Sequence, residues 1–573
     1  MQKRPVRWRI RSPRKPASPR EVIEILLAER GFTAEGLEAG LEVLETDALA
    51  IRNLDEAARL VADHILGGSK IVLTGDYDCD GLTSLAQMAL FLKQVGIRDF
   101  VAATPANRAE GYGMPVEAVR GNPDARLFVV LDCGSFDIEP VTMARRQGAD
   151  VVVIDHHAID DLARLAPATV LVNPKHPECP SPFKDFATAG LVLLFLSRLR
   201  RALEPSLGRS LPIDGEFLAL AAVGTVADMM PLVGGNRPLV RQGLATLSRG
   251  QCLPLQSLRA IAGLGGRPLK AAHIGFQIAP RLNAAGRVGD AQTALSLLLA
   301  EKPEEIDTLA RELDLLNRQR QQQVEEISAA MLERVAAMPE RATIVLADEA
   351  YPLGINGILA QHVVREVGRP AAVLQILPNE GVATGSARSI PGFDLHAALS
   401  QCSGLLDRWG GHAMAAGLTV PLAKLDRFRE RLEASAVDVR AQDAAFIERA
   451  DMEIDPALIG PELLDALERW EPHGMGNPMP RFALRDQTIT GVRVFGKAPR
   501  GPHLEIALAS GLSAVRWQGG SACEWKAGDR VDLVCTLGWS DYQACPQAVI
   551  VDAGQALFEH ANDEQPAQGV RTN

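Results

Sequence analysis

Short apolar runs alternate with helix-like segments between residue 71 and about residue 300. Strand-like runs cover residues 71–73, 127–131 and 151–154, and the segments that follow the first two, 84–95 and 138–147, have helical patterns. Such alternation is typical of a parallel sheet with helices on both faces. The pattern therefore predicts an α/β domain in this part of the chain.

The pattern changes three times beyond this domain. Residues 301 to about 337 form a polar run that favours a helix, without Gly or Pro between Glu304 and Ala337. A second α/β pattern follows, with strand-like runs at residues 343–346 and 371–374. The last hundred or so residues contain short strands and turns, which predict a small all-β barrel.

Length alone suggests about three or four domains for a chain of 573 residues. The changes of pattern predict a basic N-terminal extension (1–50), a parallel-sheet α/β domain (51–300), a connecting helix (301–340), a second α/β domain (341–437), a β-barrel (438–560) and a flexible tail (561–573). The predicted fold class is therefore α/β with a C-terminal barrel.

Composition argues against a membrane protein. The chain is 47% hydrophobic and 23% charged, and no apolar run approaches the roughly 18 to 20 residues that a membrane helix requires. The eight cysteines form no Cys-x-x-Cys pair, which favours a reducing cytoplasm. Residues 1–20 hold eight Lys or Arg and no acid but are broken by prolines, so we interpret them as a basic arm rather than a secretory signal.

The formal net charge of −11 would argue against a nucleic-acid partner if the charge were evenly spread. Its distribution matters more than its total. Basic residues are concentrated in the N-terminal arm and in specific loops, and some of the acids form a compact cluster whose charge bound cations would offset. A nucleic-acid partner is therefore compatible with the composition.

Acidic residues cluster directly after the first predicted strand. Asp76, Asp78 and Asp80 alternate within segment 76–81, behind the apolar run 71–73. Alternate carboxylates repel one another at neutral pH unless divalent cations neutralise them, and ligands bind at the carboxyl edge of an α/β sheet. A solvated turn is the alternative interpretation of this segment alone.

The same succession of apolar segment and acid recurs along the domain. The polar residues that follow the later apolar segments are Asp132, Asp155, His156, His157 and Asp228, the last after a fourth apolar stretch at residues 219–226. We expect the tips of neighbouring parallel strands to bring these groups together. Carboxylates with imidazoles suit Mn²⁺ or Mg²⁺, and the lack of clustered cysteines argues against a structural zinc site.

Two cations bridged by carboxylates can orient a water molecule and stabilise charge on a phosphoryl oxygen, as in two-metal phosphoester hydrolysis. The sequence contains no convincing Ser-His-Asp or Cys-His arrangement and no Gly-x-x-x-x-Gly-Lys-Ser/Thr phosphate loop. The pattern therefore indicates metal-dependent phosphoester hydrolysis without a protein nucleophile.

Four ordered motifs resemble those of the DHH phosphoesterase family. They are residues 76–81, 132–134, 155–157 and 224–228. Four further segments narrow the resemblance to the RecJ family of single-strand-specific 5′→3′ DNA exonucleases, and they are residues 107–113, 280–287, 385–389 and 410–412. The resemblance covers about residues 30–553, and the motifs are highly specific when taken together.

This resemblance implies a DHH domain, a connecting helix, a DHHA1 domain and an OB-fold barrel, which together enclose single-stranded DNA. It implies an exonuclease of DNA repair and recombination that uses two Mn²⁺ or Mg²⁺ ions. The expected enzyme is a cytoplasmic monomer without membrane contact, and a single-strand-binding protein or a helicase is a possible partner.

The resemblance also implies roles for individual residues. By motif position, the expected metal ligands are Asp78, Asp80, Asp132, His156 and Asp228, with Asp132 as the bridge. Asp76 and Asp155 are expected to be either ligands or groups that orient the ligands. His157 is expected to contact the scissile phosphate or to assist the leaving oxygen.

The residues that the resemblance places at the DNA are Arg108, Tyr112, Arg281, Ser386, Arg388 and His412. Guanidinium groups match phosphate geometry, and glycine-flanked loops let the backbone approach a strand. A surface ion pair is the alternative role for each arginine. Tyr112 could equally stack on a base or pack within its loop, and His412 could line the same cleft.

Two segments depart from the usual RecJ pattern. Residues 351–354 stand where a Trp-His-containing segment is common, and residues 187–190 replace a more glycine-rich segment. Two other functions stay open, namely a DHH phosphodiesterase of short oligonucleotides or cyclic dinucleotides and an inactive DNA-binding scaffold. Length and the β domain favour a long polymer, and the intact motifs argue against the scaffold.

Overall fold

The computed structural model describes residues 7–107, 111–213, 215–436, 447–496, 501–517, 519–520, 525–540, 545–554 and 558. The chain divides into two compact units. The first unit contains Ala39–Gln442 and Pro472–Asn477, and the second contains Gln2–Glu38, Asp443–Glu471 and Pro478–Asn573. The predicted tail at residues 561–573 and the predicted site residue Arg108 lie outside the described residues.

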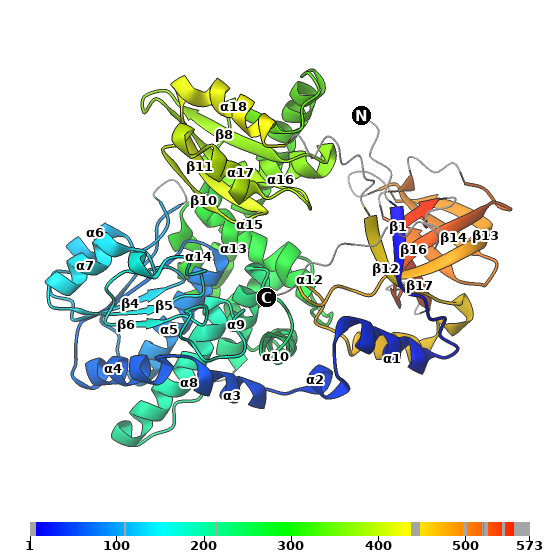
Figure 1. The fold of residues 1–573 in the computed structure, drawn as a ribbon. Coiled ribbons are helices and arrows are strands. Elements are labelled where there is room, and N and C mark those ends of the chain that lie inside the picture. The colour runs from blue at the N-terminus through cyan, green and yellow to red at the C-terminus, as the bar shows by residue number, and fades with distance from the viewer. Residues whose placement is uncertain are drawn as a thin grey trace. The chain divides into compact units, whose positions relative to one another are not determined.

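The first unit contains a five-stranded sheet whose strands all run parallel (Figure 1). The strands are β2 (Ile71–Gly75), β3 (Phe100–Ala103), β4 (Leu127–Leu131), β5 (Asp150–Ile154) and β6 (Val170–Val172), in the order β3-β2-β4-β5-β6. The central strands are almost continuously apolar because both of their faces are buried. Since parallel strands end at the same edge, the residues that follow β2, β4 and β5 meet there.

Helices cover both faces of this sheet, as predicted. The face of Val72 and Phe128 packs on α6 (Val116–Arg120) and α7 (Ile138–Arg146). The opposite face packs on α4 (Leu54–Leu66), α5 (Cys79–Val95), α8 (Thr188–Leu207) and α9 (Gly215–Ala227). The other helices of this region are α3 (Glu42–Ala50), α10 (Asn236–Arg249), α11 (Leu253–Ile261), α12 (Ala271–His273), the π-helix η2 (Ile274–Ile278), α13 (Ala279–Val288) and α14 (Ala291–Leu299).

The fourth apolar stretch, residues 219–226, is part of a helix and not a strand, which corrects the expectation that four strand tips converge. It lies within α9, which packs against α5, α8 and α10. An apolar segment that is buried on most sides lacks the periodicity that separates a helix from a strand. Asp228 therefore approaches the sheet edge from the carboxyl end of a helix.

A helix of 34 residues, α15 (Pro303–Ala336), leads to a second α/β domain, as predicted. The strands of this domain are β7 (Ile344–Asp348), β8 (Ala371–Leu377), β9 (Val382–Arg388), β10 (Arg408–Gly411) and β11 (Ala415–Pro421), in the order β10-β11-β9-β8-β7. Only β7 and β8 run parallel to each other. The accompanying helices are α16 (Asn356–Val367), α17 (Leu395–Gln401) and α18 (Leu425–Ala434).

Helix α13 is in close contact with this second domain. The Arg287 Nη1 atom donates a hydrogen bond to the Gly354 carbonyl at 3.2 Å. A Cβ atom built on Gly354 would lie 2.0 Å from the Arg287 carbonyl oxygen, so no other residue fits there. This contact brings the start of α16 against the segment that carries Arg281 and Arg287.

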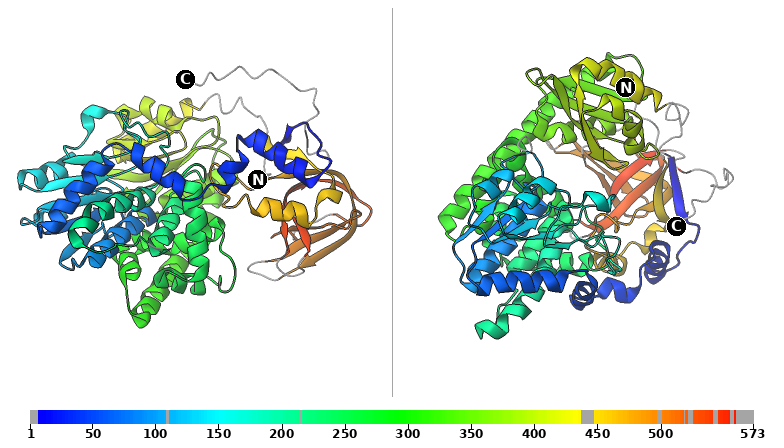
Figure 2. Two further views of the ribbon diagram at one scale, coloured as in Figure 1. Left: turned by 90° about the horizontal axis from the view of Figure 1, so that it is seen from below. Right: turned by 60° about the vertical axis from the view of Figure 1, so that its left-hand side comes forward.

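The second unit contains a closed barrel of five strands, as predicted (Figure 2, orange to red). These are β13 (Phe482–Phe495), β14 (His503–Leu508), β15 (Ser513–Arg516), β16 (Arg530–Trp539) and β17 (Pro546–Gly554), and β16 closes the barrel by pairing with β13. Also in this unit are β1 (Arg7–Ser12), α1 (Pro19–Arg30), α2 (Ala34–Glu38), β12 (Ile447–Glu453) and α20 (Pro461–Glu468). No helix of the described residues is long and apolar enough to cross a membrane.

Part of the predicted N-terminal extension belongs to the sheet of this second unit. Strand β1 pairs in parallel with β12, and β12 pairs in parallel with β13. Residues 7–12 are thus an integral strand. Their arginines alternate with Trp8 and Ile10, a period-two pattern that the interpretation as a basic arm overlooked. The predicted domain boundaries remain predictions.

Candidate metal centre

The first acidic motif forms the junction between β2 and α5. Asp78 caps α5, because its Oδ1 atom accepts hydrogen bonds from the backbone amides of Asp80 at 2.9 Å and Gly81 at 3.2 Å. A Cβ atom on Gly81 would lie 2.3 Å from the Asp76 carbonyl oxygen. The glycine therefore allows the chain to fold back tightly, and Asp76 and Asp80 are both buried.

The next two motifs follow β4 and β5 at the same edge. Asp132 has a left-handed backbone with φ of +63°, a conformation that Asp tolerates better than most residues. Its amide donates to the carbonyl of Ile154, the last residue of β5, at 3.0 Å. Asp155, His156 and His157 follow that residue directly, so the two motifs are neighbours.

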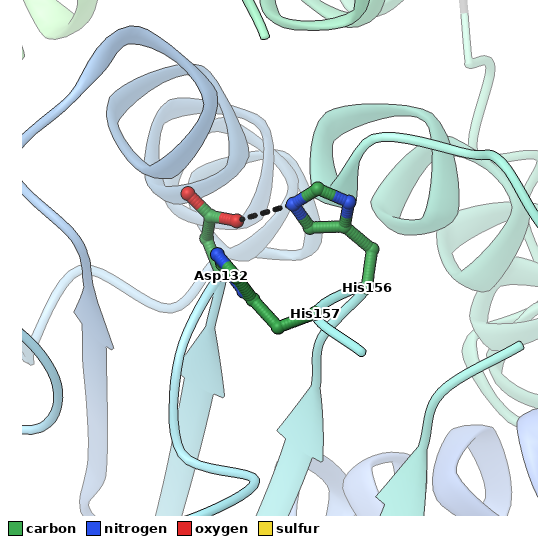
Figure 3. Close-up of side chains that lie close together, drawn as sticks. All are labelled: Asp132, His156 and His157. Carbon is green, nitrogen blue, oxygen red and sulfur yellow. Dashed lines mark ion pairs between the residues drawn. The ribbon is translucent and has the colours of Figure 1, made fainter. Parts of the chain in front are cut away.

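His156 lies close to three carboxylates. Figure 3 shows its ring directed at the Asp132 carboxylate. Its Nε2 atom is 3.4 Å from Asp132 Oδ1, 3.4 Å from Asp228 Oδ2 and 3.8 Å from Asp80 Oδ2. Among the residues that the structure describes, three groups have ligand atoms within 4.8 Å of one another. They are Asp80, His156 and Asp228; Asp76, Asp78 and Asp132; and Asp132, His156 and His157. The structure thus brings together the residues that the motifs suggested, with Asp132 shared between two groups.

Buried polar atoms in this cluster lack hydrogen-bond partners within the described part of the chain. They are Asp76 Oδ1, His156 Nδ1 and Asp228 Oδ2. A buried oxygen or imidazole nitrogen without a partner is energetically costly. Oxygen-rich donors with one central imidazole suit hard divalent cations, so the residues present fit such ions.

The amino end of α8 holds Asp80 in place. The backbone amides of Thr188 and Ala189 donate to the two Asp80 oxygens at 2.8 Å each. The Thr188 hydroxyl donates to Asp132 Oδ1 at 3.1 Å. A helix amino terminus stabilises negative charge, which explains why a buried carboxylate is tolerated here. Sequence reasoning noticed residues 187–190 only as a departure from a pattern and missed this role.

Helix α9 approaches the cluster closely because of one glycine. A Cβ atom on Gly224 would lie 2.5 Å from Thr83 Oγ1 and 2.9 Å from Asp80 Oδ1. The Asp228 amide closes the helix by donating to the Gly224 carbonyl at 2.9 Å. The small residue therefore allows Asp228 to reach His156.

Burial and mutual repulsion dominate the electrostatics of the carboxylates. Burial, reinforced by the charge of Asp78, raises the pKa of Asp80 to about 7. Burial, reinforced by Asp80 and Asp78, raises the pKa of Asp228 to about 8. The pKa values of Asp76 and Asp132 are also raised, chiefly by burial. Burial and the charge of His157 lower the pKa of His156 to about 3, so its imidazole is neutral and able to act as a ligand.

His157 has different surroundings. Its Nδ1 atom is 2.7 Å from Asp155 Oδ1, and its Nε2 atom is 3.0 Å from the Tyr112 hydroxyl. Burial opposes its charge, but Asp155 more than compensates and raises the pKa of His157 to about 9. In turn, His157 outweighs the effect of burial on Asp155, whose pKa is lowered. Asp155 thus orients the histidine and lies beside the carboxylate groups.

Tyr112 contacts the cluster through its hydroxyl group. The phenol donates to the backbone carbonyl of Asp132 at 3.1 Å. Because its only proton is used there, its contact with His157 requires the imidazole to donate, which agrees with a doubly protonated ring. Tyr112 as a whole residue is 56% exposed, so it is still accessible beside the cluster.

The other predicted DNA-binding residues lie on α13 and in the second domain. Arg281 Nε and Nη2 contact Asp314 Oδ1 of α15 at 3.0 and 2.9 Å. Ser386 and Arg388 lie two apart on β9, and a Cβ atom on Gly357 would lie 2.7 Å from Arg388 Nη2. His412 follows β10, is exposed, and donates its amide to the Ala415 carbonyl at 2.8 Å. Their predicted contacts with DNA remain predictions.

The first domain has a parallel sheet with a buried cluster of carboxylates and histidines at its strand ends. A long helix and a second α/β domain follow it. This combination defines a DHH-type phosphoesterase. Family models agree with this architecture. The DHH family N-terminal domain matches residues 70–225, the DHHA1 domain matches residues 340–438, and the RecJ OB domain matches residues 450–551.

Comparison with curated relatives shows which family of DHH-type phosphoesterases the chain resembles. The single-stranded-DNA-specific exonuclease RecJ of Thermus thermophilus is 34% identical over 96% of this chain and 79% of its own length. The exonuclease of the same name from Escherichia coli is 30% identical over 90% of this chain and 94% of its own. The crystal structure of RecJ in complex with Mn²⁺ from T. thermophilus matches with a TM-score of 0.80 and 31% identity, over 96% of this chain and 80% of that one. The chain belongs to the RecJ family.

The raised pKa values of Asp80 and Asp228 predict a stability that depends on pH when no metal is present. Their folded pKa values of about 7 and about 8 exceed the ordinary value of 3.8 for an aspartate. The folded state therefore binds more protons than the unfolded state between these pH values, and the stability falls as pH rises through this range. We expect Asp132→Asn to relieve this repulsion. The measured quantity is the melting temperature of the variant minus that of the wild type, in EDTA. This difference should increase by at least about 3 °C from pH 5 to pH 8.

Calorimetry across this pH range measures the difference directly. Asp426→Asn, which neutralises a carboxylate that is 88% exposed on α18, serves as the matched control and should leave the pH profile unchanged. Parallel profiles for wild type and Asp132→Asn would contradict the repulsion inferred here.

Proposed function

We propose that this chain hydrolyses phosphodiester bonds of single-stranded DNA, removing nucleotides from the 5′ end in repair and recombination. The observation that carries the proposal is the convergence of Asp80, Asp132 and Asp228 on the His156 imidazole at distances of 3.4 to 3.8 Å. Membership of a family whose relatives are named single-stranded-DNA-specific exonucleases supports the substrate class.

Two Mn²⁺ or Mg²⁺ ions are the proposed cofactors. The residues that would hold them are Asp76, Asp78, Asp80, Asp132, His156 and Asp228. When bound, such ions offset the carboxylate charge, orient the attacking water and stabilise charge on a phosphoryl oxygen. The sharing of Asp132 between two ligand groups supports its proposed role as the bridge.

His157 is proposed to act on the substrate and not as a ligand. Its ring is positioned by Asp155 and its pKa of about 9 keeps it protonated at neutral pH. A protonated imidazole can donate a hydrogen bond to a phosphate oxygen and a proton to the leaving oxygen. Without substrate, His157 Nε2 donates a hydrogen bond to the Tyr112 hydroxyl oxygen, and a phosphate oxygen replaces this acceptor when the strand binds.

The remaining assignments are extensions of the same proposal. Arg108, Arg281, Ser386, Arg388 and His412 are proposed to bind strand phosphates, with Ser386 and Arg388 presented side by side by β9. The enzyme is proposed to work as a cytoplasmic monomer with a single-strand-binding protein or a helicase as partner. We also propose limits for the three domains, namely residues 51–300 for the first α/β domain, 341–437 for the second and 438–560 for the barrel.

A substrate comparison tests the proposed function. With Mn²⁺, we expect kcat/KM for a 5′-phosphorylated single strand of about 40 nucleotides to exceed that for the duplex or for a dinucleotide by more than about tenfold. Strands labelled at one end or the other report the polarity. Preference for the dinucleotide would contradict the polymer substrate, and release from the 3′ end would contradict the polarity.

Replacement of the bridging carboxylate is the matched test of the site. Asp132→Ala should lower kcat/KM by more than about 100-fold while the affinity for the strand changes little, because the residue acts at the bond that is cleaved. Asp426→Ala, which changes an exposed side chain on α18, is the control and should cleave like the wild type. Undiminished cleavage by Asp132→Ala would rule out the proposed site.

Two substitutions distinguish the role of the Tyr112 hydroxyl from the role of its ring. If it positions His157, Tyr112→Phe should lower kcat by about tenfold or more and leave KM for the strand within about twofold. If the ring stacks on a base, Tyr112→Phe should behave like the wild type and Tyr112→Leu should raise KM. Steady-state kinetics of both variants distinguish the two roles.

A further inference from the structure

A cavity of about 420 Å³ lies between α15 and α16 of the first unit. Residues of α15 from Arg320 to Leu332 form most of its wall, and His362 of α16 completes it. Because an α-helix rises about 1.5 Å per residue, this wall extends for about 18 Å. The volume lies within the range of about 300 to 1,000 Å³ that is usual for small-molecule sites. The lining residues are separate from the acidic cluster and from the strand-binding candidates described above.

Arg320 places a poorly neutralised positive charge at this cavity. Its Nη2 atom donates a hydrogen bond to Asn317 Oδ1 at 2.9 Å, and its buried Nε atom has no hydrogen-bond partner within the described residues. Burial and the positive charge of Arg287 lower the pKa of Arg320. No carboxylate of the described residues pairs with Arg320. A buried cation beside another cation is stabilised when an anion binds to it.

Two neutral hydrogen-bonding groups belong to the same wall. Ser328 is buried, and its Oγ atom lacks a hydrogen-bond partner within the described part of the chain. The His362 Nδ1 atom accepts a hydrogen bond from Arg365 Nη2 at 2.9 Å, and burial, reinforced by the charge of Arg365, lowers the pKa of His362. A neutral imidazole that accepts at Nδ1 carries its proton on Nε2, so His362 can donate from that atom.

Most of the remaining wall is apolar. Val324, Ala329 and Leu332 present hydrocarbon groups along α15. The acid of the wall, Glu325, is exposed and is five residues from Arg320, which corresponds to about 7.5 Å of helix rise. A carboxylate at that separation can accept from an amino group of a ligand whose anionic end contacts Arg320. The wall therefore suits a ligand with one anionic end, an apolar body and hydrogen-bonding groups.

We propose that the cavity between α15 and α16, here called the α15–α16 cavity, binds a nucleoside 5′-monophosphate, with the phosphate on Arg320 and the base along Val324 and Leu332. Guanidinium forks match phosphate oxygens, and apolar side chains cover the faces of a flat ligand.

The inference deepens the proposed function and rests on it, because the proposed reaction releases this ligand. Water adds its hydroxyl to the phosphorus that links the first two nucleotides of a 5′-phosphorylated strand, and the O3′ atom leaves with a proton. The first nucleotide is then a nucleoside 5′-monophosphate, and the shortened strand keeps a 5′-phosphate.

The test measures binding to the full-length protein without divalent ions. Deoxyadenosine 5′-monophosphate is titrated in EDTA up to about 5 mM by isothermal titration calorimetry. Without ions the carboxylate cluster repels a phosphate, so binding reports the cavity. We expect Ala329→Trp, which fills the cavity, and Arg320→Gln, which removes its positive charge, each to weaken binding by at least about tenfold.

Matched controls make the same changes outside the cavity. Ala330→Trp changes the next residue of α15, which is exposed and does not line the cavity, and Arg311→Gln removes an exposed charge of the same helix. Both should bind the nucleotide like the wild type. Melting temperatures no more than about 2 °C below that of the wild type show that the variants are folded. A wild type that does not bind the nucleotide, or an Ala329→Trp variant that binds it equally well, would overturn the inference.

Three other compounds test the identity of the ligand. Deoxyadenosine, inorganic phosphate and benzoate should each bind at least about tenfold more weakly than the nucleotide, because each lacks part of what the wall recognises. Equal binding of benzoate would indicate a site for apolar anions in general and would overturn the nucleotide as ligand.

Cleavage of the strand of about 40 nucleotides with Mn²⁺ separates this inference from the proposed function. A wild type that cleaves the strand but binds no nucleotide in EDTA would remove the inference and leave the proposed function standing. A wild type that binds the nucleotide at the α15–α16 cavity but cleaves no strand would contradict the proposed function and leave the binding site standing. Ala329→Trp should cleave the strand like the wild type.

Discussion

The structure depends on holding several carboxylates together in a buried place, where each raises the proton affinity of the others. Asp80 and Asp132 are almost inaccessible to solvent, and Asp228 reaches the same imidazole. Repulsion of this kind would open the site unless other forces opposed it. Two do so here: the backbone amides at the start of α8, which bind Asp80, and the tight packing of α5, α8 and α9, which leaves the side chains no room to separate.

The surrounding architecture follows from that requirement. Parallel strands deliver Asp76, Asp132 and Asp155 to one edge, and glycines at positions 81 and 224 allow the helices to approach that edge more closely than any side chain would permit. The same close approach recurs at Gly354, where the second domain meets α13 through Arg287. The phosphate-binding candidates on β9 are thereby linked to the domain that carries the acids.

Sequence reasoning predicted much of this arrangement because its signals were local. Apolar runs followed at once by acids located the ends of β2, β4 and β5, and the ligand candidates met as expected. It failed where the signal was not local. The run at residues 219–226 is apolar all round and could not be assigned to helix or strand, the Thr188 contacts come from backbone amides and not from a diagnostic side chain, and the pairing of β1 with β12 joins segments more than 400 residues apart.

The central claim is that these carboxylates surround two divalent ions with Asp132 between them. The most direct measurement is anomalous scattering from crystals of the full chain grown with Mn²⁺. The account predicts two peaks in contact with the Asp132 carboxylate, one also beside Asp80, His156 and Asp228 and the other also beside Asp76 and Asp78. A single peak, or peaks away from Asp132, would contradict it.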